Sequence, residues 1–528
     1  IVMKNNFILG DVSAIKEKGI ESLLDNYYWP VSDSEFREFV KYTHYEYLKI
    51  VHSIDDDDIR NIAIVELSFI AKLQQILHYN YVKKYSHDNN LELINSKLSE
   101  EFYNPNWDLI SKHYVSLSPL LSKTKGLVKR TVKNILFNRH ISTRRYIKNL
   151  IFGSNVIGIG SNDILKKEFI IKKNYFCDHV NATDLYSSKI ISNKQLKDIS
   201  IRIDNEIITP YIYKLETAKN KFVEGIDITT IKEAWKSRFT DAARIYLNII
   251  SKGKSPCLLV TELAKPIHKL VTVAYQKLGS DVYCFHHGHD TAVTVHSVGH
   301  DITSLHCLKY VVPSCGISNK YQKVYPHLST KYYSSESNWY KLQLKKYICK
   351  TNKKIKKIML VGFPLNPVRY VDGESCFFYS RIDLEYRLIT FLKKNGYSVI
   401  YKAHPDRLSE ATGLYEGVVD EIISSPFETI INSTDCFLFT HSSSTTFGYA
   451  LLTNKPIFLI DINSSNVELD SYNLLRKRVD MIPSYTVKST RIFFDKDIML
   501  KKMRRSPVGV QDNSYLEKMF LHNTINIK

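Results

Sequence analysis

The sequence has no apolar run long enough to cross a membrane. Its longest apolar runs, residues 436–439 and 456–460, are far shorter than the roughly 20 residues that a spanning helix needs. The first residues also do not combine a basic start, an apolar block and a small-residue cleavage site. We therefore expect a cytoplasmic protein whose contact with a membrane, if any, is peripheral.

The cysteines are not spaced as metal or redox motifs. There are eight of them, at positions 177, 257, 284, 307, 315, 349, 376 and 436, and no two form a CxxC pair. This spacing argues against a zinc site and against a thiol–disulfide exchange motif. We expect reduced thiols, and neither a bound metal nor a cofactor.

Internal repeats and low-complexity tracts are absent too, whereas basic charge is abundant. Lys and Arg number 73 against 54 Asp and Glu, a formal net charge of +19. Such a surplus favours an anionic partner: nucleic acid, an anionic membrane surface or phosphorylated substrates. An AT-rich genome, which enriches Lys, Asn, Ile and Tyr together, would explain the same composition. No RNP-type, zinc-finger or helix-turn-helix signature supports the nucleic-acid alternative.

A chain of 528 residues exceeds what one core usually organises, so we expect two domains. The first 150 residues have helical periodicity, with a helix start at Ser32 and one helix over residues 59–84. Residues 123–152 alternate basic and apolar side chains. This basic segment either lies on an anionic bilayer or packs its apolar stripe on the domain. The pattern alone does not distinguish these two alternatives.

Strands alternate with helices over the rest of the chain, which is typical of parallel sheets. The pattern begins with a strand at 155–160 and restarts after a lysine-rich connection at 341–357. We therefore predict an α/β protein of two doubly wound, Rossmann-like domains with a helical N-terminal elaboration. We predict a helical region at residues 1–150 that belongs to the first domain, the rest of that domain at 151–345, a second domain at 355–510, and a C-terminal helix or tail at 511–528.

Ligands of doubly wound sheets bind beyond the carboxyl ends of the strands, so we consider the residues that follow each strand. In the second half, His404 and Pro405 follow the strand at 398–402, and the proline biases the histidine to an extended backbone. Five consecutive hydroxyl residues, 442–446, open a helix behind another buried strand. Free amides and hydroxyls there suit a phosphate, although simple helix capping needs only one of the five. Gly362 follows the first strand and would let the backbone approach a ligand, or serve packing.

In the first half, His286-His287-Gly288-His289-Asp290 follows the strand at 281–285. This composition fits general acid–base or nucleophilic chemistry better than a metal site, because neighbouring side chains of an extended chain point in opposite directions. Glu262 follows the adjacent strand and should face the same crevice. We predict His287, Asp290 and Glu262 as catalytic residues; two carboxylates permit either an inverting or a retaining course.

The second half also resembles a known family. Tyr401-Lys402-Ala403-His404-Pro405, the later Ser442-Ser443-Ser444-Thr445 and the stretch from Ala450 to Pro456 resemble the HP and SS/ST motifs of GT-B glycosyltransferases that use CMP-activated acids, namely bacterial sialyltransferases and Kdo transferases. The resemblance spans about residues 358–460. It implies a nucleotide site formed by the following residues: His404, Pro405, Ser442, Ser443, Ser444, Thr445, Gly362 and Lys402. One position departs from the pattern, because Tyr449 stands where many GT-B enzymes have a ribose-binding glutamate.

This resemblance implies the transfer of a CMP-activated ulosonic acid (Kdo, sialic or another nonulosonic acid) to a surface glycan of capsule, O-antigen or lipopolysaccharide. The CMP-sugar would be a substrate, the acceptor lipid-linked, and the enzyme located at the inner face of the inner membrane, with no nucleic-acid partner. The His-Gly loop also resembles CDP-glycerol-type polyol-phosphate transferases. Those usually carry an aspartate before the serines, where this chain has Thr440-His441. A sugar 2-epimerase of the same architecture and a basic nucleic-acid-binding protein are the remaining alternatives.

Overall fold

The structure is a computed structural model, which describes most of the chain. The described residues are 6–95, 138, 140–142, 154–161, 163–186, 192–225, 227–253, 256–286, 298–326, 328–346, 354–363, 365, 377–404, 408–442, 444–462, 467–487, 490–505 and 512–521. Nearly all of the basic segment 123–152 lies outside them. The two alternatives for that segment therefore stay open.

The N-terminal region is helical, as predicted. Helix α3 (Asp33–His52) begins at the predicted cap, since the Ser32 hydroxyl accepts a hydrogen bond from the Glu35 amide (3.2 Å) and Glu35 accepts one from the Ser32 amide (2.9 Å). This reciprocal capping box satisfies two amides that the first helical turn leaves free. Helix α3 packs against α5 (Leu67–Asp88) and α12 (Thr209–Thr217).

The single helix predicted over residues 59–84 is wrong, because two helices occupy that range. Helix α4 (Asp57–Val65) ends at Glu66, and α5 begins one residue later. The Glu66 carboxylate is fully buried and accepts hydrogen bonds from Arg238 Nε (2.8 Å) and Trp235 Nε1 (3.2 Å) of α13 (Ile228–Ile250). This tertiary contact lies at the helix break and is not visible in the apolar periodicity.

The first sheet has six parallel strands in the order β4-β3-β5-β6-β7-β8. Its strands are β3 (Val156–Ile159), β4 (Asp178–His179), β5 (Cys257–Val260), β6 (Val282–Phe285), β7 (Lys309–Val312) and β8 (Lys331–Ser334). The chain moves from β3 to one neighbour and then returns to the other side of β3, so the order reverses between β3 and β5. Helices α10 (Ile164–Lys172), α14 (Pro266–Lys277) and α16 (Cys315–Val324) connect its strands.

The second sheet has seven strands in the order β11-β10-β9-β12-β13-β14-β15, and its order reverses between β9 and β12. Its strands are β9 (Lys357–Val361), β10 (Ser398–Lys402), β11 (Glu421–Ile423), β12 (Cys436–Phe439), β13 (Ile457–Asp461), β14 (Asp480–Val487) and β15 (Arg491–Phe494). Only the β14–β15 pair is antiparallel. Helix α18 (Phe377–Lys394) connects β9 to β10, and α21 (Thr445–Leu451) connects β12 to β13.

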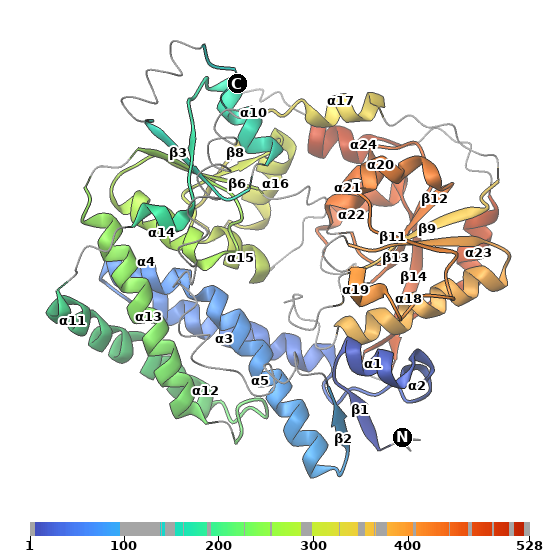
Figure 1. Ribbon diagram of the computed structural model, residues 1–528, viewed down its shortest axis with the longest axis horizontal. Helices are drawn as coiled ribbons and strands as arrows, with labels where there is room; N and C mark the ends of the chain where they lie inside the picture. The colour runs from blue at the N-terminus through green and yellow to red at the C-terminus, as the bar shows by residue number, and fades with distance from the viewer. Residues whose placement is uncertain are drawn as a thin grey trace, which may run out of the picture.

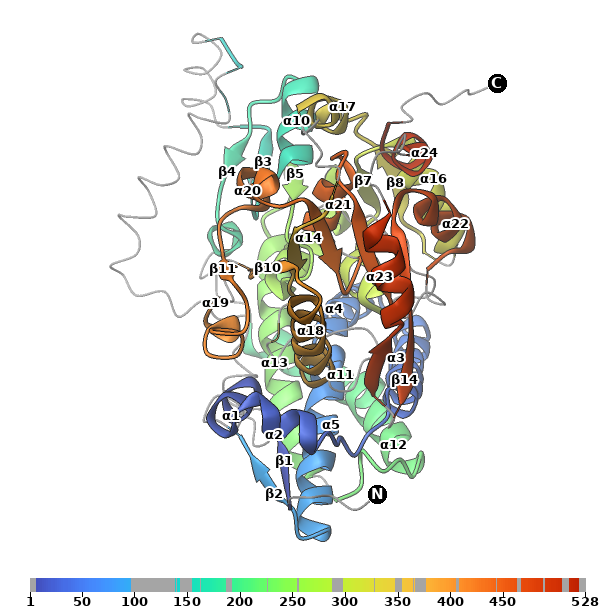
Figure 2. The same ribbon diagram turned by 90° about the vertical axis from the view of Figure 1, so that its right-hand side faces the viewer.

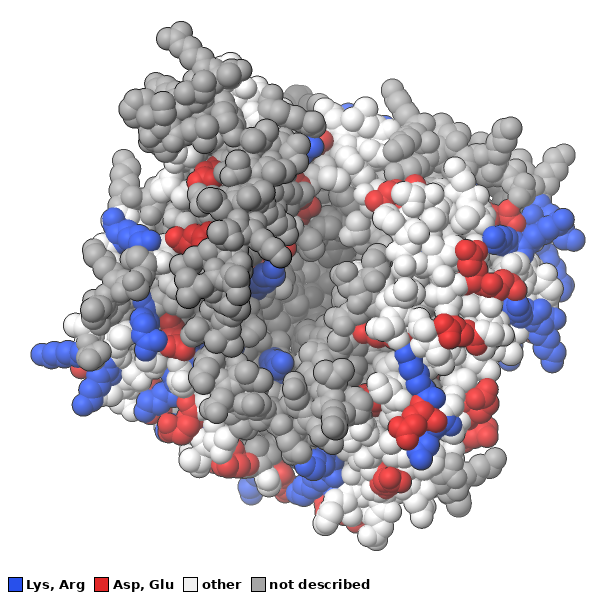
Figure 3. All heavy atoms as spheres, in the orientation of Figure 1, with Lys and Arg blue, Asp and Glu red and all other residues white. Residues whose placement is uncertain are grey.

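The two sheets occupy separate lobes, with the first sheet on the left and the second on the right of Figure 1. The surface is hollowed between them (Figure 3). Two doubly wound sheets and a helical N-terminal region confirm the predicted fold class, the GT-B architecture. The domain boundaries stay predictions.

The N-terminal segment contacts the second lobe, and the C-terminal tail contacts the first lobe. The N-terminal segment with β1 (Phe7–Leu9), α1 (Val12–Lys18) and α2 (Ile20–Asp25) packs beside α18 (Figures 1 and 2). The rings of Tyr27 and Tyr379 lie 5.0 Å apart there. At the other end, the π-helical turn η6 (Glu517–Leu521) packs on α16 of the first lobe, and α24 (Ser514–Leu516) packs on α22 (Leu469–Arg478).

Candidate functional site

Three loops of the second lobe begin at one level of the sheet. Strand β9 lies between β10 and β12, and its last residue, Val361, pairs with Lys402 on one side and Phe439 on the other. The residues that follow these strands are therefore neighbours, and they border the point between β9 and β12 where strand order reverses. Doubly wound sheets bind ligands at such a point. Three described candidates from separate strands, Gly362, His404 and Ser442, are therefore brought to the same edge.

The loop after β9 packs tightly against Tyr401 of β10 and Glu385 of α18. A Cβ atom at Gly362 would overlap the hydroxyl of Tyr401, so only glycine fits this position. The Gly362 amide donates to the carbonyl of Lys402 (3.0 Å), and the Phe363 amide donates to the carboxylate of Glu385 (3.0 Å). The packing interpretation of Gly362 is thereby supported, and a direct contact with a ligand stays a prediction.

The loop after β10 carries the predicted histidine. Ala403 is buried, and its amide continues the ladder to Ile423 of β11 (2.9 Å). His404 is exposed, so its ring is accessible to a ligand. Pro405 lies outside the described residues.

Lys402 is the least accessible of the described nucleotide-site candidates. It is 5% exposed, and its ammonium donates to the carbonyl of Ala403 (2.5 Å). Burial lowers the pKa of Lys402, while the nearby Glu428 carboxylate acts in the opposite direction. A direct contact between Lys402 and a ligand would require the side chain to move.

The loop after β12 contains the hydroxyl cluster. Ser444 caps α21, because its Oγ accepts a hydrogen bond from the Phe447 amide (3.1 Å). Ser442 is partly exposed and Thr445 is exposed, whereas Ser443 lies outside the described residues. Helix α21 has 7 residues, so its dipole is short. One hydroxyl of the five is thus used for capping.

Thr440, the first residue after β12, is almost fully buried. It is 1% exposed, and its hydroxyl has no hydrogen-bond partner among the residues that the structure describes. Its carbonyl accepts a hydrogen bond from Arg381 Nη1 of α18 (2.7 Å). A buried hydroxyl of this kind usually bonds to an ordered water or a ligand.

Sequence reasoning missed three residues of this edge: His441, Arg381 and Glu385. The His441 ring stands edge-on to the ring of Phe363, with centroids 4.7 Å apart, between the loops that follow β12 and β9. His441 had a sequence signal, since it directly precedes the serines. Arg381 and Glu385 lie inside a long helix, where nothing in the sequence pattern marks them.

Tyr449 is used for packing. Its ring meets Trp339 of α17 (Trp339–Lys346) edge to face, with centroids 5.1 Å apart. Tyr449 therefore contacts the segment that connects the two lobes. Any ribose contact would have to come from other residues.

The first lobe has a comparable reversal point between β3 and β5. Gly160, with φ +83°, directly follows β3, and a Cβ there would overlap the Thr261 hydroxyl. Next to Thr261, Glu262 has φ +57°, a left-handed conformation that costs a non-glycine residue about 1–3 kcal/mol. Its carboxylate forms an ion pair with Lys265 and is partly exposed. Such strain is frequent at functional sites, which supports Glu262 as a candidate.

The other two catalytic candidates, His287 and Asp290, lie outside the described residues. Their neighbour His286, at the end of β6, is buried. The His286 amide donates to the carbonyl of Val311 (2.9 Å), and its Nε2 lies 3.2 Å from the hydroxyl of Tyr321 on α16. His286 is thus held against the first sheet, and the roles of His287 and Asp290 stay predictions.

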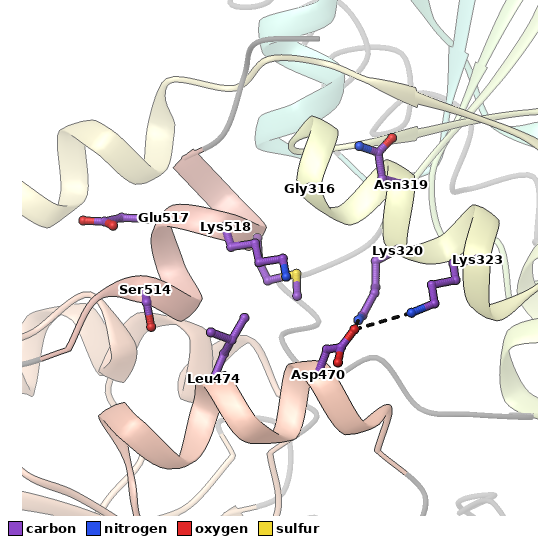
Figure 4. Close-up of a pocket in the computed structure, with 10 residues that line it drawn as sticks. Gly316, Asn319, Lys320, Lys323, Asp470, Leu474, Ser514, Glu517 and Lys518 are labelled. Atoms are coloured by element: carbon purple, nitrogen blue, oxygen red, sulfur yellow. Dashed lines mark hydrogen bonds and ion pairs between the residues drawn. The ribbon is translucent and has the colours of Figure 1, made fainter. Parts of the chain in front are cut away.

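A cavity of about 760 Å³ lies between α16, α22 (Leu469–Arg478) and the C-terminal tail (Figure 4). It is lined by Gly316, Asn319, Lys320, Lys323, Asp470, Leu474, Ser514, Glu517, Lys518 and Met519. Lys320 and Lys323 of α16 form ion pairs across the cavity with Asp470 of α22, the latter at 3.4 Å. None of the predicted site residues that the structure describes lines this cavity.

The described part of the chain shows neither a metal-binding cluster nor a membrane-spanning helix. There, no group of three or more His, Cys, Asp or Glu side chains is arranged to hold a metal ion. Across the same residues, no helix has the length and apolar character that a membrane crossing requires.

Comparisons with known proteins do not assign this chain to a family. No protein-family model matches the chain. No curated protein matches it either. Among solved structures, the chain is similar to Phytolacca americana UGT2 complexed with UDP-2fluoro-glucose and pterostilbene, at 9% identity and a TM-score of 0.33, over 69% of this chain and 92% of that chain. A likeness this remote carries no argument about function, which therefore depends on the site itself.

Proposed function

We propose that this protein is a GT-B glycosyltransferase that binds its nucleotide-sugar donor at the carboxyl ends of β9, β10 and β12. One observation carries the proposal: the strand register brings the exposed His404 and the hydroxyl loop of Ser442, Ser444 and Thr445 to the same edge, beside the reversal of strand order. An imidazole and several hydroxyls can donate hydrogen bonds to phosphate oxygens. The buried Thr440 hydroxyl fits a ligand or water at this edge.

The donor that we propose is a CMP-activated ulosonic acid. The His404-Pro405 pair and the serines resemble the motifs of enzymes that use CMP-activated acids, and the net charge of +19 suits an acidic sugar, a phosphate and a lipid-linked surface glycan as acceptor. The side chains of Pro405 and Ser443 belong to the proposed site through this resemblance alone.

The reaction would exchange one bond at the anomeric carbon of the sugar. An acceptor hydroxyl oxygen forms the new glycosidic bond, the bond to the CMP phosphate breaks, and CMP leaves with the electron pair. Hydrogen bonds from His404 and the serines would stabilise the charge that develops on the phosphate. His287, Asp290 or Glu262 would accept the acceptor proton, or one carboxylate would act as nucleophile in a retaining course.

Calorimetry with CMP, CDP, UDP and GDP tests the donor. We expect the wild-type protein to prefer CMP and His404→Ala to weaken CMP binding about tenfold or more, because a hydrogen bond to a charged phosphate is lost. His87→Ala is the matched control, since the side chain of His87 is 90% exposed near the end of α5. Equal affinity for all four nucleotides would reject the CMP-sugar assignment. A CDP-polyol transferase also releases CMP, so binding of CDP-glycerol but not of a CMP-sugar would favour the polyol-phosphate alternative.

A further inference from the structure

Helix α18 lies behind both loops that border the reversal point of the second sheet. Two of its polar residues, Arg381 and Glu385, are separated by four positions and so lie on one face of the helix. They are 3% and 0% exposed. Burying charged side chains is costly, so each is expected to have a specific set of partners.

Glu385 is bonded to the loop that follows β9. Its Oε1 accepts the amide of Phe363 (3.0 Å), and its Oε2 accepts the hydroxyls of Tyr401 (2.8 Å) and Tyr415 (3.0 Å). The Tyr401 hydroxyl occupies the space where a side chain at Gly362 would lie. One carboxylate thus fixes the position of this loop through a direct bond and through Tyr401.

Arg381 is bonded to the loop that follows β12. Its Nη1 donates to the carbonyl of Thr440 (2.7 Å), and its guanidinium lies 5.3 Å from the centroid of the Phe363 ring. The same Phe363 ring meets His441 edge to face. The arginine therefore contacts both loops, and each loop is bonded to the same helix face.

We propose that Arg381 and Glu385 are positioning residues that set the spacing of the two loops and thereby the affinity for the donor nucleotide. This inference rests on the proposed function, because the loops matter only if the donor binds between them. Neither side chain is accessible enough to touch the ligand itself.

The charge of Glu385 is consistent with such a role. Burial raises its pKa to about 7, although the Phe363 amide, the two tyrosine hydroxyls and Arg381 all favour the ionised form. The three hydrogen bonds to its oxygens offset part of the cost of burying the charge. Replacing one of these partners should therefore change the position of the loop that follows β9.

Two tyrosines provide a matched pair of variants. Tyr401 and Tyr415 are both fully buried or nearly so and donate to the same oxygen of Glu385, but only the Tyr401 hydroxyl abuts Gly362. We expect Tyr401→Phe to raise the dissociation constant of CMP about tenfold and Tyr415→Phe to change it less than about twofold, with similar losses of melting temperature. Equal effects of the two variants on CMP binding would overturn the proposal.

A second pair tests the carboxylate itself. Asp383 is also fully buried on α18, but it bonds to Arg387 and to Arg491 of β15 (2.8 Å to the latter). Glu385→Gln should speed hydrogen exchange of residues 357–363 and weaken CMP binding, whereas Asp383→Asn should lower stability without either effect. If both variants change exchange in that segment equally, the positioning role is rejected.

The two proposals fail in different ways. Should the wild-type protein bind no CMP, the donor assignment is wrong, yet the comparison of hydrogen exchange still decides whether Glu385 positions the loop. Should the wild-type bind CMP and the paired variants behave alike, only the positioning role is wrong.

Discussion

Ser444 shows how one side chain can serve both folding and binding. Its oxygen accepts the hydrogen bond of the Phe447 amide and so caps α21, which leaves its own hydrogen free to be donated. A phosphate oxygen at the loop after β12 would be a suitable acceptor. Capping and donor binding are therefore not alternatives at this residue.

Replacement of Ser444 by alanine should separate the two contributions. We expect Ser444→Ala to lower the free energy of unfolding by about 1 kcal/mol through loss of the cap. Urea denaturation measures this change, and calorimetry with CMP measures any further loss of affinity. Thr445→Ala is the control, since Thr445 is adjacent but exposed and does not cap the helix. An equal loss of stability in both variants would contradict the assigned cap.

At the scale of elements, a buried tertiary contact lies at the break between α4 and α5. Glu66 forms a buried ion pair with Arg238 of α13, whose side chain is 5% exposed. Removing one partner of such a pair leaves a buried charge without compensation, which typically costs 3–5 kcal/mol. This contact connects the N-terminal helices to the helices of the first lobe.

We expect Glu66→Gln to lower the free energy of unfolding by about 3–5 kcal/mol, measured by denaturant titration. The double variant Glu66→Leu with Arg238→Met should recover most of this loss, because it removes both charges. Glu233→Gln, an exposed position on the same helix as Arg238, should change stability by less than about 0.5 kcal/mol. A small effect of Glu66→Gln would mean that the pair contributes little.

The strands of the sheets could be predicted closely from sequence where they are buried on both faces. Strand β10 has the predicted bounds, because central parallel strands are short apolar runs between polar turns. Two strands were missed: the edge strand β8 is the polar sequence KYYS, and β14, which lies between β13 and β15, contains Pro483. Their composition carries no comparable signal.

Of the candidate site, the loop residues could be predicted from the sequence, and the residues within helix α18 could not. His404 and the serines follow strands, so the sheet topology alone brings them together. Arg381 and Glu385 act from within a helix, and their importance depends on which loops pack against it. Contacts of that kind are tertiary, and no local pattern in the sequence encodes them.

At the scale of the whole molecule, both chain ends tie the lobes together. Trp29, in the N-terminal segment, donates a hydrogen bond to His78 of α5 (3.2 Å) and packs against Phe378 of α18 (centroids 5.9 Å apart). At the opposite end, the Ser314 hydroxyl at the start of α16 bonds to the carbonyl of Met519. The lobes are thus connected at sites far apart in the sequence, besides the linker between them.

Ion pairs between α16 and α22 add a further connection. Lys320, 7% exposed, pairs with Glu468, whose carboxylate also accepts the Ser471 amide (2.8 Å) and caps α22. Burial alone would raise the pKa of Glu468, but the bonds to Lys320 and Ser471 prevail and lower it to about 2. Because the folded pKa lies below the unfolded one, this pair contributes stability above about pH 4.5, and the contribution is lost as the pH falls towards 2.

Charge reversal tests whether this pair holds the lobes together. Lys320→Glu or Glu468→Lys alone should lower the melting temperature and speed hydrogen exchange in α16 and α22, whereas the double swap should recover at least half of both effects, since opposite charges again face each other. Lys323→Glu is the control, because Lys323 is 68% exposed and water screens its pair with Asp470. If the single variants behave like the control, the tail and the N-terminal segment must hold the lobes without help from this pair. If the double swap restores stability but not the exchange rates, Glu468 acts on α22 as a cap rather than across the lobes.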